Sequence, residues 1–66
     1  MVLSDTIKER RSQLNISQID LAEMAGVSLA TVKDIERGMG NPSIKTVEKI
    51  LAVLGMELVY QLRQTV

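Results

Sequence analysis

The sequence contains no cysteine, histidine, tryptophan or phenylalanine, and Tyr60 is its single aromatic residue. Without cysteine or histidine, the chain cannot form a disulfide or the usual ligand set of a zinc site. The same absence removes the side chains that many enzymes use as nucleophile and base, and the acidic residues show no paired arrangement. We therefore expect no enzymatic activity, no metal and no cofactor.

Neither positive nor negative charge is in excess. Eight lysine and arginine residues balance eight aspartate and glutamate residues, so the formal net charge is zero. The total charge gives no argument for nucleic-acid binding, although a local basic patch remains compatible with it. The 66 residues suffice for one domain, near the lower size limit for an independent hydrophobic core.

Long apolar runs are missing as well. Only Val2 and Leu3 follow the first methionine before polar residues begin. No later run approaches the length of a membrane-spanning helix. The sequence thus predicts a cytoplasmic protein with neither a signal peptide nor a membrane partner.

The stretch from Ser17 to Gly38 carries the clearest pattern in the chain. Two short helical patterns, each opening with a serine, are joined by a turn around Gly26. This arrangement is typical of a helix-turn-helix motif. The helical period predicts inward faces of Leu21, Met24 and Ala25 in the first helix and of Val32, Ile35 and Glu36 in the second.

A wider set of small, polar and apolar residues surrounds this motif: Gln18, Leu21, Ala22, Gly26, Val27, Ser28, Val32, Ile35, Glu36, Gly38, Pro42, Ser43, Leu54 and Gly55. These residues resemble the pattern of the lambda-repressor-like (XRE) helix-turn-helix family, over roughly residues 7–55. The resemblance implies an all-α fold of four helices. It also implies DNA binding through the second helix of the motif.

The resemblance places base contacts on the outward side of that second helix. Leu29 and Ala30 offer only apolar contact, which suits thymine methyl groups. Lys33 can reach guanine acceptors or a phosphate, whereas Asp34 can accept from a cytosine amino group but also repels phosphates, so we favour Lys33. A solvated helix face or a protein-binding face remains the alternative. The predicted DNA-binding residues are Gln18, Ser28, Leu29, Ala30, Thr31, Lys33, Asp34, Arg37, Asn41 and Lys45.

Arg11 and Glu36 are charged residues on otherwise apolar helix stripes. An arginine in such a place needs a buried anion, and Glu36 is equally out of place on its own helix. We therefore predict an ion pair between them, and the family resemblance implies the same pair. The alternative is that both side chains bend out to water.

Local signals set the expected helix boundaries. Serine N-caps are expected at Ser4, Ser17, Ser28 and Ser43, and glycines end helices at Gly26 and Gly55. The first helix is expected to run to about Gln13 or Leu14. Its predicted inward residues are Leu3, Ile7 and Leu14, and those of the fourth helix are Ile44, Val47, Ile50, Leu51 and Leu54.

After Gly55 the apolar period changes from helical to alternating, which is typical of a strand. One strand alone cannot satisfy its backbone, so we predict that it pairs with the same strand of a second copy. A continued or fifth helix is the alternative. The chain would then consist of a DNA-binding domain, 1–55, and a dimerisation segment, 56–66, with the dimer contacts Met56, Leu58, Val59, Tyr60 and Leu62.

The sequence as a whole predicts a homodimeric transcriptional regulator, most simply a repressor, that binds double-stranded DNA at an inverted repeat. The terminal strand resembles that of the HipB-type antitoxin and repressor subgroup, which implies a toxin partner of the HipA kinase type. A stand-alone phage-type repressor and a protein-interaction module without DNA binding are the alternatives. We expect no small-molecule ligand, because the fold uses the whole chain.

Overall fold

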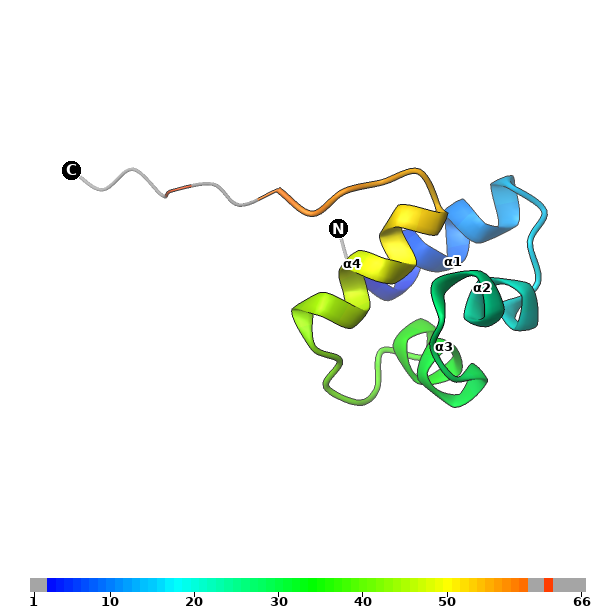
Figure 1. The fold of residues 1–66 in the computed structure, drawn as a ribbon, viewed down its shortest axis with the longest axis horizontal. Helices are drawn as coiled ribbons and strands as arrows, with labels where there is room; N and C mark the ends of the chain where they lie inside the picture. The colour runs from blue at the N-terminus through cyan, green and yellow to red at the C-terminus, as the bar shows by residue number, and fades with distance from the viewer. Residues whose placement is uncertain (1–2, 60–61, 63–66) are drawn as a thin grey trace.

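A computed structural model describes residues 3–59 and 62 of the chain. Within these residues the backbone forms four helices, α1 (Leu3–Gln13), α2 (Gln18–Ala25), α3 (Leu29–Glu36) and α4 (Ile44–Val53). Helix α2 packs against both α3 and α4, and α1 packs against α3 (Figure 1). The four-helix all-α architecture predicted from the sequence is confirmed.

Three of the helices begin with a serine N-cap. The hydroxyls of Ser17, Ser28 and Ser43 accept the backbone N–H three residues further on, from Asp20, Thr31 and Thr46 respectively. Each bond satisfies one of the amides that a helix start leaves without a partner. The predicted N-caps of α2, α3 and α4 are therefore confirmed, while α1 begins at Leu3, one residue before the predicted cap at Ser4.

The core lies where the four helices meet. Its five largest fully buried side chains come from all four helices and from the residue that ends α4; they are Ile7, Leu21, Val32, Ile50 and Leu54. Ala22 and Ala25 line the same core from α2, where small side chains let the neighbouring helices approach closely. Among the described residues, one continuous apolar centre is thus built from aliphatic side chains.

Four residues predicted to face inward are exposed instead. Met24 is 63% exposed, and Ala22 takes its place in the core, because the buried face of α2 is centred on its two alanines and Leu21. Leu3 and Leu14 stand at the two ends of α1, and Ile44 is the first residue of α4, one turn before the buried Val47. The predicted inward residues were thus wrong at the two ends of α1, at the start of α4 and at Met24, and correct at the other predicted positions.

Arg10 fixes the end of α4 to α1. Its Nε donates to the carbonyl oxygen of Leu54 at 2.9 Å, and this carbonyl is one that the helix itself leaves unpaired. Gly55 follows with a φ of 72°, a left-handed value that glycine adopts without strain. These two features set the direction in which the chain leaves the helices.

The segment after Gly55 leads away from the helices (Figure 1). Met56 and Leu58 are half-buried against the core, whereas Val59 and Leu62 are 71% and 99% exposed. Met56–Val59 and Leu62, the residues of this segment that the structure describes, form no strand, so the predicted strand is not confirmed in the single chain. Tyr60 lies outside the described residues.

Ile50 and Ile44 offer a matched test of this core. Ile50→Ala should lower the free energy of unfolding by about 2–5 kcal/mol, because Ile50 is fully buried and the change leaves a cavity. Ile44→Ala removes the same atoms from a side chain that is 56% exposed, and it should cost much less. Urea unfolding followed by circular dichroism measures both, and equal losses would contradict this placement of α4.

Candidate nucleic-acid interface

The turn between α2 and α3 fixes the angle of the motif. Gly26 has a φ of 71°, and its N–H donates to the last turn of α2, as the predicted glycine C-cap requires. The next residue, Val27, is half-buried against the core and holds the turn in place. A side chain at Gly26 would find open space but a strained backbone. The turn is therefore short because glycine permits it.

Helix α3 has one buried and one exposed side. Val32, Ile35 and Glu36 are buried, and they hold the helix against α1 and α2. Ala30, Lys33 and Arg37 are exposed along the opposite side. Such a helix, anchored by its back and open at its front, has the shape that a DNA major groove receives.

Leu29 and Asp34 are less free than the sequence suggested. Leu29 is half-buried and packs against the core, so only part of its side chain is available to a ligand. Asp34 is also half-buried, and its carboxylate accepts from Nη2 of Arg37, three residues further on. This ion pair was not predicted from the sequence, although opposite charges at that helical spacing are its usual signal.

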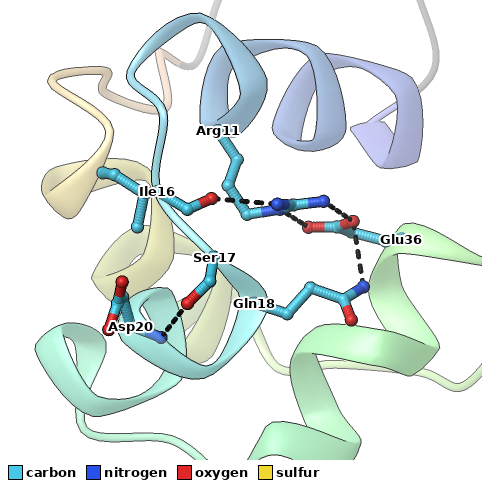
Figure 2. A network of polar contacts seen from close by, with 6 residues as sticks. All are labelled: Arg11, Ile16, Ser17, Gln18, Asp20 and Glu36. Carbon is cyan, nitrogen blue, oxygen red and sulfur yellow. Dashed lines mark hydrogen bonds and ion pairs between the residues drawn. The ribbon is translucent and has the colours of Figure 1, made fainter.

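A polar network on the buried side of α3 joins this helix to α1 and α2 (Figure 2). Arg11 of α1 donates to both carboxylate oxygens of Glu36, from Nε at 2.6 Å and from Nη2 at 3.0 Å. Its Nη1 donates to the carbonyl oxygen of Ile16 at 2.9 Å, which ties in the linker to α2. Gln18 adds a bond from Nε2 to Glu36 Oε1 at 3.2 Å. The network therefore holds α3 from both neighbouring helices.

Opposing effects set the ionisation of this pair. Burial alone raises the pKa of the Glu36 carboxyl, but hydrogen bonds from Arg11 and Gln18 and the charge of Arg11 outweigh it. The pKa of Glu36 consequently lies below its ordinary value. The hydrogen bond to Glu36 raises the pKa of Arg11 above its ordinary value, despite a smaller opposing effect of burial. Both groups are charged in the folded protein at neutral pH.

The predicted phosphate contacts lie around the starts of α2, α3 and α4. Gln18 begins α2, with one amide donor engaged by Glu36. Ser28 caps α3, and its hydroxyl is 2.8 Å from that of Thr31. Asn41 and Lys45 are exposed in the loop before α4 and in its first turn. Helix starts present backbone N–H groups that suit an anion, so these positions are compatible with phosphate binding.

Across 3–59 and 62, no group of three or more acidic, cysteine or histidine side chains is placed to hold a metal ion. None of the helices in that part of the chain is long and apolar enough to cross a membrane.

Comparison with known proteins identifies relatives along most of the chain. A family model described as "Helix-turn-helix" matches residues 7–61. The immunity repressor protein of Bacillus phage phi105 is 36% identical over 58 residues, which make up 88% of this chain and 40% of that protein. The HTH-type transcriptional regulator SinR of Bacillus subtilis (strain 168) is 38% identical over 58 residues, 86% of this chain and 52% of SinR.

A solved structure extends the comparison to the fold. The chain superposes on a structure of the SinR and SinI protein complex with a TM-score of 0.78 and 39% sequence identity. The alignment covers 83% of this chain and 54% of that chain. The chain therefore spans about half the length of these relatives, and the likeness concerns the helix-turn-helix part.

The ion pair between Arg11 and Glu36 makes a prediction for stability. Arg11→Met should cost about 3–5 kcal/mol at neutral pH, because it leaves the buried Glu36 carboxylate without its main partner. Glu36→Gln keeps the shape and one of the two acceptor oxygens, and it leaves no unpaired carboxylate in the core, so it should cost less. Urea unfolding of both variants measures the difference, and equally small losses would show that the pair is dispensable.

The same pair also predicts acid sensitivity. Because the folded-state pKa of Glu36 is depressed, its contribution to stability is full above the ordinary value of 4.5 and disappears as the pH falls through the folded value. Wild-type stability should therefore drop as the pH falls below the ordinary value of 4.5, and part of that drop should be missing in Glu36→Gln. An identical pH profile of both proteins would contradict this.

Proposed function

The chain belongs to the helix-turn-helix family whose model matches residues 7–61, and we propose that it is a transcriptional regulator that binds double-stranded DNA as a homodimer at an inverted repeat. The observation that carries this proposal is the two-sided character of α3. Its buried side is anchored by the core and by Arg11, while Ala30, Lys33 and Arg37 are exposed together.

The proposed interface divides into base contacts and phosphate contacts. Ala30, Lys33 and the free part of Leu29 would meet base edges, by apolar contact with thymine methyls and by donation from Lys33 to guanine. Around them, phosphate contacts would set the position on the duplex without reading sequence. Those contacts are assigned to Gln18, Ser28, Thr31, Asn41 and Lys45.

Dimerisation is assigned to residues 56–66, which follow the DNA-binding domain, 1–55. The segment leaves the helices in a direction fixed by Arg10 and Gly55, and it carries the exposed apolar Val59 and Leu62. An identical strand from a second copy would supply the missing backbone partners. Two α3 helices about 34 Å apart would then enter successive major grooves.

The named relatives support regulation of transcription, and one of them was solved in complex with a second protein. We propose repression as the mode of action, with activity controlled by a partner protein or by dimer concentration. A toxin of the HipA kinase type is the partner that the sequence resemblance implies. A stand-alone repressor of the phage type is the alternative, and the phage phi105 relative favours it.

A protein-interaction module is the competing function. Two observations favour it: the net charge of zero, and the 56% exposure of the apolar Ile19 on α2. Such a module would not bind DNA, whereas a regulator must. Salt dependence separates the two, because phosphate binding releases counterions and weakens as salt rises.

Lys33 provides the direct test of DNA binding. Lys33→Ala should weaken binding to a selected operator duplex by about 1–3 kcal/mol if Lys33 reads a base. If it contacts a phosphate, the salt slope should instead fall by about 0.9 on every duplex. Fluorescence anisotropy at several salt concentrations distinguishes these results. Lys49→Ala, an exposed lysine outside the predicted contacts, is the matched control. A wild type that ignores all duplexes would exclude the proposed function.

Truncation tests the dimerisation segment separately. A chain ended at Gly55 retains the buried residues Ile7 to Leu54 but loses the segment assigned to pairing. We expect a dimeric full chain and a monomeric truncated chain by sedimentation velocity, with much weaker operator binding by the monomer. A truncated chain that remains dimeric would place the interface on the helices.

A further inference from the structure

Asp34 and Arg37 form an ion pair on the outward side of α3, at the end of the helix. The bond joins Nη2 of Arg37 to Oδ1 of Asp34, and the three-residue spacing places the two side chains next to each other. The Arg37 side chain is 63% exposed and that of Asp34 is 45% exposed. The pair therefore lies in solvent beside the base-contacting positions proposed above.

The two side chains of the pair differ in their surroundings. The backbone oxygen of Asp34 accepts the N–H of Met39 at 2.8 Å, which fastens this turn of α3 to the following loop. The loop also runs close to the Asp34 side chain, since a Cβ on Gly40 would lie 3.7 Å from that of Asp34. Arg37, at the end of the helix, projects into solvent and bonds to Asp34. The backbone of both residues is hydrogen-bonded, but the Asp34 side chain is the less exposed end of the pair, beside the loop, and Arg37 is the more exposed end.

Geometry also assigns the two ends different distances from the bases. A helix in a major groove contacts base edges mainly with its first residues, while its last turn lies nearer the backbone. Arg37 follows that last turn, and its guanidinium carries five N–H donors in one plane, of which several remain free of Asp34. Planar donors of this kind match the oxygens of a phosphate.

We propose that Asp34 is a positioning residue that holds Arg37 toward a DNA backbone phosphate, and that it does not itself contact a base. This inference rests on the proposed function and refines it. A free carboxylate at Asp34 would repel the phosphates. When it is paired with Arg37, the carboxylate repels the phosphates less and orients the guanidinium. The pair has no net charge, so its contribution to binding lies in the direction of the guanidinium.

The proposal predicts that the effect of Asp34 changes sign with its partner. In the wild-type chain, Asp34→Asn should weaken binding about two- to fivefold even though it removes a negative charge, because Arg37 loses its support. In the Arg37→Gln chain the same change should strengthen binding, since only repulsion is then removed. Arg37→Gln alone should also lower the salt slope by about 0.9.

A double-mutant cycle measures this on two probes, a duplex that the wild-type chain selects from a randomised pool and a random-sequence duplex. Fluorescence anisotropy gives the affinities, and a repeated selection with Asp34→Asn gives its base preference. Glu9→Gln removes an exposed carboxylate of α1 and is the matched control for charge alone. Thermal unfolding checks that each variant is folded.

Each outcome has one meaning for the proposal. A sign change with unaltered base preference supports it. Stronger binding by Asp34→Asn in both backgrounds overturns it, because Asp34 then only repels DNA. A changed preference at one operator position also overturns it, because Asp34 then contacts a base. In both cases the wild type still binds DNA and the proposed function stands, whereas a wild type without DNA binding overturns both.

Discussion

The bond between Arg11 and Glu36 is the interaction on which the arrangement of the helices depends. A core of about ten small and medium apolar side chains excludes water, but it specifies orientation weakly because apolar contact has no direction. The guanidinium and carboxylate supply direction at one point shared by α1 and α3. Gln18 and the carbonyl of Ile16 extend that point to α2 and its linker. The hydrogen bonds on the buried side of α3 therefore set the orientation of its outward side.

The net charge of zero includes charged residues that have different structural roles. Glu36 pairs with Arg11 in the interior, and Asp34 pairs with Arg37 at the surface. Because Asp34 is paired with Arg37, the outward side of α3 carries less unpaired negative charge than its sequence suggests. A domain that binds DNA as proposed would use oriented donors and helix starts as well as bulk attraction, so it would need only a small basic surface.

The sequence predicted most of the fold because its determinants are local. Serine caps at three helix starts and glycine after α2 act through bonds within a few residues, and the pairing of Arg11 with Glu36 follows from two charges on apolar stripes. Met24 was wrong because the buried face of α2 is centred on Leu21 and its two alanines, and Ile44 was wrong because periodicity does not give the extent of the core along a helix. The pairing of Asp34 with Arg37 had a signal in the sequence, opposite charges three residues apart, but the nearness of the loop at Gly40 to Asp34 depends on the fold, which no short pattern reveals. Pairing of the last segment depends on a second molecule and stays a prediction.

The separation of the two sides of α3 has a consequence for how this chain can diverge. Val32, Ile35 and Glu36 carry the folding energy of the helix, whereas Ala30 and Lys33 are exposed and lie outside the core cluster. If α3 reads DNA as proposed, substitutions at the second set would alter what is recognised at little cost in stability. Duplicated copies of such a gene could then acquire new operators within a few mutational steps, while the first set would keep every copy folded.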